Sequence, residues 1–208
     1  MKSLFSCAAC LSIAVVFCAW QVSAKDQPKP VKVDQPATST KAAVKKKKSV
    51  IGRHMPNFIR PSSAGKEVAL SDFGDAKLVV VIFMGTECPI GNAYVPDLVA
   101  LQQRYPDKQV QVIGINSVLS DSAETVARYV KEFKIDFPVL IDNDQTIADR
   151  FGAQRTPEIF VLDGQRKIRY RGRIDDRFGY IYKREESRRQ ELEEALKELL
   201  AGKDVSVP

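Results

Sequence analysis

The sequence predicts an α/β fold in which helices flank a central mixed sheet. The composition is that of a globular protein, because 44% of the 208 residues are hydrophobic and 28% are charged. Between residues 78 and 141, apolar runs typical of strands alternate with segments of helical periodicity. Two further strand-like runs then flank the dipeptide Asp163-Gly164, which favours a hairpin turn. Parallel strands joined by helices, followed by an antiparallel hairpin, make a mixed sheet.

The predicted order of elements is βαβαββα, and its first half begins with a buried strand. Residues 78–84 read Leu-Val-Val-Val-Ile-Phe-Met, a run without polar positions that indicates a central strand buried on both faces. A helix is expected over residues 89–105, because its apolar positions have near-helical spacing and Pro89 is tolerated in a first turn. A second strand over 109–116 leads to a helix that Ser120 or Asp121 caps and that ends near Lys134.

The second half contains three more strands and a helix. Residues 139–141 form the third strand, and right-handed crossovers make these first three strands parallel. Residues 159–162 and 167–171 form the hairpin. The last helix, from about residue 184 to 201, carries one leucine-rich stripe and ends before Gly202.

The amino-terminal part of the chain divides into two segments before this domain. Residues 1–24 have Lys2, an apolar stretch and Val22-Ser23-Ala24 at their end, which is the pattern of a cleaved signal peptide. An uncleaved membrane anchor is the alternative. Residues 25–55 are predicted to be a basic flexible linker, and residues 56–208 one folded domain. The protein is therefore expected to be exported, to the periplasm or outside the cell, and to be associated with the envelope if the linker binds it.

The net charge of +6 does not indicate nucleic-acid binding. Residues 25–55 carry nine basic and two acidic side chains, whereas residues 56–208 carry 22 basic and 24 acidic ones. The basicity thus belongs to the linker and not to the domain. Lys45–Lys48 are expected either to be part of a solvated spacer or to make a weak contact with an anionic envelope surface.

Only one of the four cysteines lies in the predicted domain. Cys7, Cys10 and Cys18 fall within the signal peptide, so a disulfide scaffold is excluded and Cys88 is left alone. Cys88 follows the all-apolar strand and precedes Pro89, where the backbone N–H groups at a helix start favour a thiolate. The N–H groups of Ile90 and Gly91 are the expected stabilisers. The alternative is a buried cysteine that only fills space.

A second segment is predicted to meet Cys88. Arg155-Thr156-Pro157 directly precedes the strand at 159–162, and a proline there can hold a cis peptide bond beside backbone that is free for an extended partner. The alternative is a proline that only begins an edge strand.

These motifs together resemble a known superfamily. The run from Phe83 to Asn92 (Phe-Met-Gly-Thr-Glu-Cys-Pro-Ile-Gly-Asn), the segment Thr-Pro-Glu-Ile-Phe-Val-Leu-Asp at 156–163 and the order βαβαββα are similar to the thioredoxin-like superfamily. Within it, the chain resembles an exported redoxin of the alkyl hydroperoxide reductase and thiol-specific antioxidant (peroxiredoxin-like) type. The resemblance implies a thioredoxin-like fold and a redox-active cysteine without a cofactor. The residues it implies are Cys88, Thr86 and Pro157 as catalytic and Thr156, Pro89 and Arg155 as substrate-binding.

The sequence also departs from both types of relative. A thioredoxin-like exchange protein carries Cys-x-x-Cys, whereas this chain has Cys-Pro-Ile-Gly at 88–91. A typical peroxiredoxin has a threonine three residues before its cysteine, whereas Thr86 is two residues before Cys88. The main expectation is an antioxidant, peroxidase-like oxidoreductase that an external thiol recycles. The alternatives are one-cysteine thiol–disulfide exchange with a partner protein disulfide and a non-catalytic binding module of the same fold.

Other candidate sites are weak. His54, the only histidine, has no second ligand nearby in the sequence, so no metal site is expected. No glycine-rich phosphate loop or Ser/His/Asp set is present. Charged residues cluster after Gly164, and they are expected to line the solvent face of a strand or, alternatively, to dock an acidic partner: Arg166, Lys167, Arg169, Arg171, Arg173, Asp175, Asp176 and Arg177.

Overall fold

The computed structural model of the chain describes residues 49–105, 109–179 and 182–207. The predicted signal peptide, most of the predicted linker and Lys45–Lys48 lie outside the described residues. Among the helices that are described, none combines the length and apolar character needed to cross a lipid bilayer.

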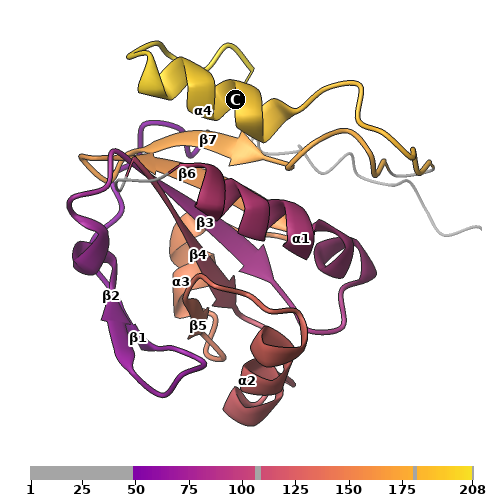
Figure 1. Ribbon diagram of the computed structural model, residues 1–208. Helices are drawn as coiled ribbons and strands as arrows, with labels where there is room; N and C mark the ends of the chain where they lie inside the picture. Colours follow the sequence, from indigo (N-terminus) through magenta and orange to yellow (C-terminus); the bar gives the residue numbers. More distant parts are fainter. Residues whose placement is uncertain (1–48, 106–108, 180–181, 208) are drawn as a thin grey trace, which may run out of the picture. The chain divides into compact units, whose positions relative to one another are not determined.

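A five-stranded mixed sheet forms the centre of the domain (Figure 1). Its order is β5-β4-β3-β6-β7, and β3 pairs in parallel with β4 and antiparallel with β6. The strands are β3 (Leu78–Met84), β4 (Val110–Asn116), β5 (Val139–Ile141), β6 (Glu158–Asp163) and β7 (Ile168–Gly172). The predicted fold class is confirmed, and all seven residues of β3 are buried as its uninterrupted apolar sequence requires.

Helices and a small hairpin cover the sheet on both faces. The helices are α1 (Pro89–Arg104), α2 (Ala123–Glu132), α3 (Thr146–Phe151) and α4 (Glu191–Leu200). A separate hairpin of β1 (Ile59–Pro61) and β2 (Glu67–Ala69) leads into a short 3₁₀ helix, η1 (Leu70–Phe73). The sequence pattern does not predict β1, β2, η1 or α3.

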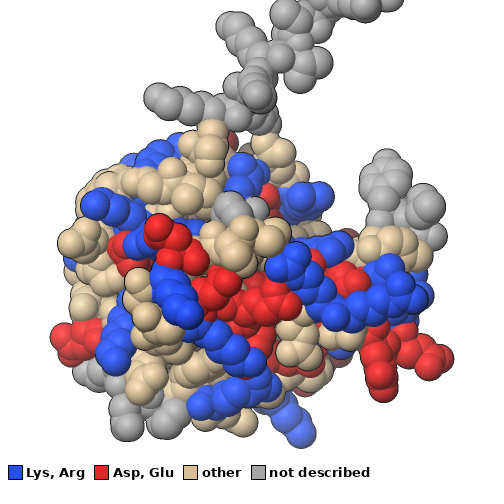
Figure 2. Space-filling view, turned by 90° about the horizontal axis from the view of Figure 1, so that it is seen from above, with Lys and Arg blue, Asp and Glu red and all other residues tan. Residues whose placement is uncertain are grey.

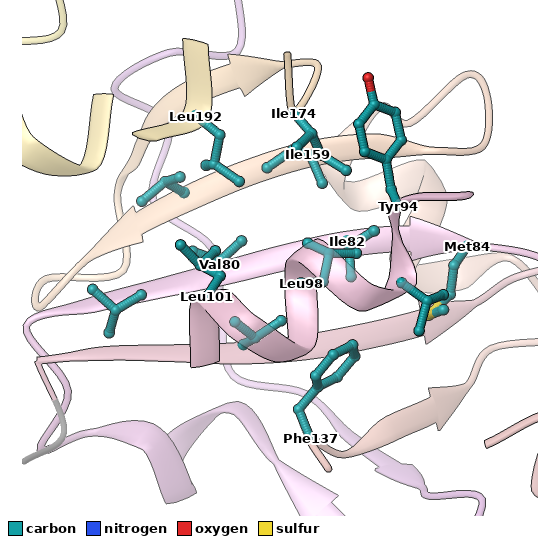
Figure 3. Close-up of a cluster of buried hydrophobic side chains, with 14 of the residues drawn as sticks. Val80, Ile82, Met84, Tyr94, Leu98, Leu101, Phe137, Ile159, Ile174 and Leu192 are labelled. Atoms are coloured by element: carbon teal, nitrogen blue, oxygen red, sulfur yellow. The ribbon is translucent and has the colours of Figure 1, made fainter. Parts of the chain in front are cut away.

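The alternating sides of the strands produce two separate cores. On one face, Val80 and Ile82 of β3 pack with apolar residues of α1, α2 and α4, as Figure 3 shows for Tyr94, Leu98 and Leu192. On the other face, Val81 and other odd-numbered residues of β3 pack with α3, η1 and the amino-terminal segment. Burial of this apolar area on both sides is the main source of stability.

Gly114 of β4 is required by packing in the first of these cores. A Cβ atom at this position would lie 2.7 Å from Met84 Sδ and 3.1 Å from a methyl group of Val139. The first contact is shorter than real Cβ atoms make and the second is tight, so the neighbouring side chains would have to move. Glycine therefore allows β3, β4 and β5 to keep their side chains in one layer.

Two predicted helices begin later than expected, and in both cases an aspartate is involved. Ser122 caps α2 by accepting a hydrogen bond from Thr125 N, so Asp121 lies outside the helix. α4 begins at Glu191 and not near residue 184, because the Asp176 carboxylate accepts hydrogen bonds from Arg188 N and Arg189 N. These bonds hold residues 184–190 in an irregular conformation.

Residues 50–55, which the sequence analysis assigned to the linker, pack on the domain. Gly52 N donates to Ile168 O (2.7 Å), Ile168 N donates to Arg53 O (3.0 Å), and Met55 N donates to Arg166 O (2.8 Å). The Met55 side chain is 1% exposed. The folded part of the chain therefore includes residues before position 56.

The charged residues after Gly164 largely pair within the chain. Arg169 bridges Asp163 and Asp204, Arg173 pairs with Glu191, and Arg177 pairs with Asp97 and Asp175. Figure 2 accordingly shows basic and acidic side chains side by side on the face seen from above. Since these guanidinium groups already have partners, the structure gives no support to the alternative of a basic docking face.

Candidate active site around Cys88

Cys88 lies where the central strand passes into the first long helix. β3 ends at Met84, and Cys88 is the N-cap of α1, with φ −80° and ψ 107°. Its Sγ accepts a hydrogen bond from Gly91 N at 3.3 Å, while its carbonyl accepts one from Asn92 N. Pro89, at the first helical position, has no N–H to satisfy. The sulfur thus occupies the place of a capping oxygen and faces the positive end of the helix.

The antiparallel pairing of β3 with β6 brings the second predicted segment to the sulfur. Phe83 at the end of β3 pairs with Glu158 at the start of β6, so the residues before Glu158 lie beside those after Phe83. Cys88 Sγ donates a hydrogen bond to Thr156 O at 3.3 Å, and the Thr156–Pro157 peptide bond is cis. The geometry therefore brings Cys88, Pro89, Thr156 and Pro157 together.

Gly91 stands at the position of the second cysteine in a Cys-x-x-Cys motif. A Cβ atom there would lie 3.3 Å from Cys88 Cβ and 3.4 Å from Cys88 Sγ. The sulfur therefore packs directly against the backbone of Gly91. Cys88 is half-buried, and it is the free cysteine of the described residues.

Thr86 is held by a buried carboxylate and not by the sulfur. Its hydroxyl donates to Asp121 Oδ1 at 2.9 Å, and its backbone N–H donates to Asp121 Oδ2 at 3.0 Å. Asn116 Nδ2 also donates to Oδ2, at 2.6 Å, and Asp121 is only 4% exposed. These bonds satisfy the buried charge and fix the loop before Cys88. No hydrogen bond between Thr86 and Cys88 occurs among the described residues.

A tyrosine and an asparagine tie α2 to the same loop. Tyr129 OH donates to Asn92 Oδ1 at 2.9 Å, and Asn92 Nδ2 donates to Thr86 O at 3.1 Å. Burial raises the pKa of Tyr129 to about 12, and its neighbours Cys88 and Asp121 raise it further. Tyr129 therefore stays a neutral hydrogen-bond donor throughout the physiological pH range.

Glu158 and Arg171 support the loop on the other side of Cys88. Glu158, 3% exposed, accepts hydrogen bonds from Arg171 Nε at 2.8 Å and from Gln154 N at 2.7 Å. Arg171 also donates to Gly152 O at 2.9 Å. The pair fixes the residues that lead into Thr156, while Arg155 is exposed. Arg155 has no bond to Cys88 among the described residues.

The described residues contain no group of histidine, cysteine or acidic side chains with the geometry of a metal site. His54 forms an isolated bridge with Lys167, away from Cys88 in the sheet, at the start of β7.

Sequence reasoning missed the residues that hold the site in place. The sequence pattern gives Asp121 only the role of a helix cap and Asn116 that of a strand end. It places Tyr129 within a helix and Arg171 among surface charges. Asn92 and Glu158 were part of the quoted motifs but received no role. The one available signal was their chemistry, because a polar residue at the end of an apolar strand, such as Asn116, needs a partner when it is buried.

Comparisons with known proteins identify the family of the chain. The model of the AhpC/TSA family matches residues 51–171 of the chain. A thiol-disulfide oxidoreductase ResA from Bacillus thuringiensis subsp. konkukian is 32% identical over 124 residues, which cover 60% of this chain and 70% of the relative.

Solved structures of other proteins show which fold the chain has. A hypothetical protein from Sinorhizobium meliloti superposes with a TM-score of 0.70 at 28% identity, over 77% of this chain and 90% of that one. Peroxidoxin BcpB from Mycobacterium tuberculosis superposes with a TM-score of 0.57 at 21% identity, over 73% of this chain and 96% of that one. The fold is thioredoxin-like, as the resemblance implied, and the chain belongs to the AhpC/TSA family.

Proposed function

We propose that the protein is a thiol–disulfide oxidoreductase that works through the single thiol of Cys88. The observation that carries the proposal is the position of Cys88 Sγ, between Gly91 N and Thr156 O at the start of α1. A half-buried sulfur at such a position has the surroundings of a reactive cysteine and not of a space-filling one. Similarity to a thiol-disulfide oxidoreductase supports the same chemistry.

The first step is attack of the Cys88 thiolate on a disulfide of the substrate. One S–S bond forms between Cys88 and the substrate, and the other substrate sulfur leaves as a thiolate. The N–H of Gly91 stabilises negative charge on Cys88 before the attack and after its release. Because glycine replaces the second cysteine of Cys-x-x-Cys, the mixed disulfide waits for an external thiol.

The other predicted site residues take supporting roles in this proposal. Thr156 and Pro157 present the backbone against which a substrate lies, and Pro89 starts the helix that carries the sulfur. Thr86 acts through its bonds to Asp121, which hold the loop. Arg155, whose side chain is exposed, binds a charged group of the substrate in this proposal.

A thiol-dependent peroxidase is the second candidate. Membership of the AhpC/TSA family favours it. Cleavage of an O–O bond is helped by donors that bind the departing oxygen, but the Thr86 hydroxyl is bonded to Asp121 and the Arg171 guanidinium to Glu158 and Gly152 O. This arrangement favours disulfide substrates over peroxides.

The test compares the two oxidants on the full chain. The Cys88 peptide is followed by mass spectrometry after reaction with a small disulfide or with hydrogen peroxide, and Cys88→Ser is the control. We expect faster reaction than for free cysteine with the disulfide only, and no exchange in Cys88→Ser. Fast sulfenic acid formation would favour the peroxidase. The binding module would be established by two results together. The wild type would react slowly with both oxidants, and Cys88→Ser would still capture the same protein partner as the wild type.

An exported location is part of the proposal and rests on residues 1–24. In an oxidising compartment a disulfide substrate is available, whereas a lone thiol needs a supply of reductant. The substrate is therefore a partner protein disulfide or a small disulfide outside the cytosol.

A further inference from the structure

A cavity of about 380 Å³ opens at Thr156, whose carbonyl oxygen contacts Cys88 Sγ. It lies between the ends of β3 and β4, α3 and the loop before β6. Its lining includes Leu119, Ala148, Asp149, Ala153, Arg155 and Thr156. The proposed exchange reaction gives a role to two of these residues, Arg155 and Thr156, and leaves the rest of the cavity without one.

Thr156 joins the cavity to the reactive sulfur. This residue lines the cavity, and its carbonyl oxygen is 3.3 Å from Cys88 Sγ. Cys88 does not itself line the cavity, so a ligand must extend past Thr156 to bring its sulfur atom to Cys88. The cavity is suited to a ligand that takes part in disulfide exchange.

The walls combine apolar surface with one charge of each sign. Leu119 is 72% exposed at the cavity, although a leucine gains from burial, and Ala148 and Ala153 add further apolar surface. Asp149 and Arg155 also line it, and neither side chain has a hydrogen-bond or ion-pair partner among the residues that the structure describes. This differs from Arg169, Arg171, Arg173 and Arg177, which are all paired.

We infer that the cavity binds a small peptide thiol that carries both a carboxylate and an ammonium group, and that this thiol recycles Cys88. Arg155 binds the carboxylate and Asp149 the ammonium group. The apolar surface of Leu119 covers the carbon chain between them. The inference rests on the proposed exchange function of Cys88 and names its resolving thiol.

The size of the cavity favours a small ligand over a protein segment. Its volume lies near the lower end of the range of about 300–1,000 Å³ that is usual for small-molecule sites. A peptide of two or three residues fits such a space. A stable protein partner would need roughly 800 Å² of surface on each side, far beyond these walls.

The recycling reaction balances with two molecules of this thiol. The thiolate of the first attacks the Cys88 sulfur of the mixed disulfide, and the substrate leaves as a thiolate that takes up the proton. The second attacks the sulfur of the bound small thiol, so Cys88 leaves as a thiolate and the small disulfide is released. In total, one substrate disulfide is reduced and two small thiols are oxidised.

The experiment measures the reverse of the last recycling step, in which reduced Cys88 reacts with the small disulfide. The full chain is reduced and mixed with oxidised glutathione, which is a charged peptide disulfide, or with the uncharged 2-hydroxyethyl disulfide. The rate of mixed disulfide formation is measured on the Cys88 peptide alone, so that Cys7, Cys10 and Cys18 do not contribute. The result is the ratio of the two rates.

Charge reversal of Arg155 is the critical change. In Arg155→Glu we expect the ratio of the glutathione rate to the hydroxyethyl rate to fall by about 5-fold or more, as for loss of one partly exposed ion pair. The matched control is Arg150→Glu, because Arg150 is also exposed and lies on α3 but does not line this cavity. Its ratio is expected to stay within about 2-fold of the wild type.

The outcomes separate this inference from the proposed function. If the rate ratio falls equally in Arg155→Glu and Arg150→Glu, only general surface charge acts and the binding site is overturned. An unchanged ratio in Arg155→Glu would also overturn the binding site. If the wild type reacts with neither disulfide, the exchange function itself fails. If it reacts with both and only Arg155→Glu alters the ratio, the cavity binds the charged thiol.

Discussion

At the scale of single residues, Gly91 decides how Cys88 can complete its reaction. The position allows a disulfide, because a Cβ atom there would lie 3.3 Å from Cys88 Cβ, close to the separation of about 3.5–4.5 Å in disulfides. In Gly91→Cys we therefore expect an internal disulfide after mild oxidation, and fewer trapped mixed disulfides with substrates. Free-thiol titration and peptide mass measure both effects.

The matched control for this change is Gly91→Ser, which adds a Cβ atom and a group of similar size but no thiol. It shares any crowding of Cys88 Sγ and cannot form the disulfide. If Gly91→Cys retains its thiols and still traps mixed disulfides as the wild type does, the distance between positions 88 and 91 is not the one that the structure shows.

Tyr129 gives the site a measurable dependence on alkaline pH. Its pKa is raised from 10.0 to about 12, so the folded chain keeps the phenol proton where the unfolded chain loses it. The resulting stabilisation is complete below pH 10 and is lost between about pH 10 and 12. Tyr129→Phe should lower stability at pH 7 by about 1 kcal/mol, through the lost bond to Asn92, and make the alkaline decline shallower.

Urea unfolding at pH 7, 9.5 and 11 measures this difference. The decline will not disappear, because burial also raises the pKa of Tyr94 and of Tyr170. Tyr182→Phe is the control, since hydrogen bonds from Arg184 and Arg173 lower the pKa of this exposed tyrosine. A decline that is equally shallow in both variants would contradict the role assigned to Tyr129.

At the scale of elements, the loop before β6 depends on the Glu158–Arg171 pair. In Glu158→Gln the side chain keeps its shape, but its amide group must face either Gln154 N or the Arg171 guanidinium, both of which are donors. We expect a loss of about 2 kcal/mol in the free energy of unfolding, because a buried donor is left without an acceptor. Urea denaturation with an unchanged m-value measures it.

Glu194→Gln provides the comparison for this loss. Glu194 also pairs with an arginine, Arg189, but both side chains of that pair are more than 40% exposed. Exposed pairs contribute at most about 1 kcal/mol, so this variant should unfold nearly as the wild type does. Equal losses in the two variants would show that burial does not make the Glu158 pair special.

The elements also show what the sequence could and could not predict. β3, β4, β5 and the hairpin were predicted within one or two residues, because long apolar runs and the Asp163-Gly164 turn are local signals. The six-residue α3 is too short for periodicity. It is held by the buried Asp142, whose carboxylate accepts bonds from Ile147 N and Ala148 N. Such contacts depend on the fold and leave no local pattern.

The residues of the site likewise divide into those that the sequence predicts and those that it does not. Cys88 and Thr156-Pro157 were predicted to meet from two local motifs, a cysteine before a helix and a proline at the start of a strand. The contacts of Asp121 with Thr86 and of Glu158 with Arg171 join residues 35 and 13 positions apart. Without the register between elements, the sequence only showed charged residues, which are more often solvated than buried.

At the scale of the whole domain, the segment before β2 protects both edges of the sheet. Residues 52–55 bond to the start of the β7 edge strand, through Ile168 and Arg166. At the opposite edge, Ser62 bridges Leu140 and Ser63 N donates to Val139 O at 2.8 Å. Between these points Phe58 enters the core under the sheet. Uncovered edge strands are sites of aggregation, so this segment serves stability and solubility together.

Removal of the first part of this segment tests how far the folded unit extends. A chain of residues 56–208 lacks Met55, which is 1% exposed, and the bonds to Ile168 and Arg166. Loss of a buried methionine alone costs about 2–5 kcal/mol. For a domain of this size, a loss of about 3 kcal/mol lowers the Tm by roughly 6–12 °C. We expect this decrease relative to residues 49–208, with more aggregation on heating.

The variant Met55→Ala in residues 49–208 separates the two contributions to that loss. It removes the buried side chain but keeps the backbone bonds at the edge of β7, so its Tm should lie between those of the two chains. Its aggregation on heating should resemble that of residues 49–208, because the edge stays covered. If residues 56–208 melt within about 2 °C of the longer chain, residues 50–55 do not belong to the folded unit and the domain begins where the change of composition placed it.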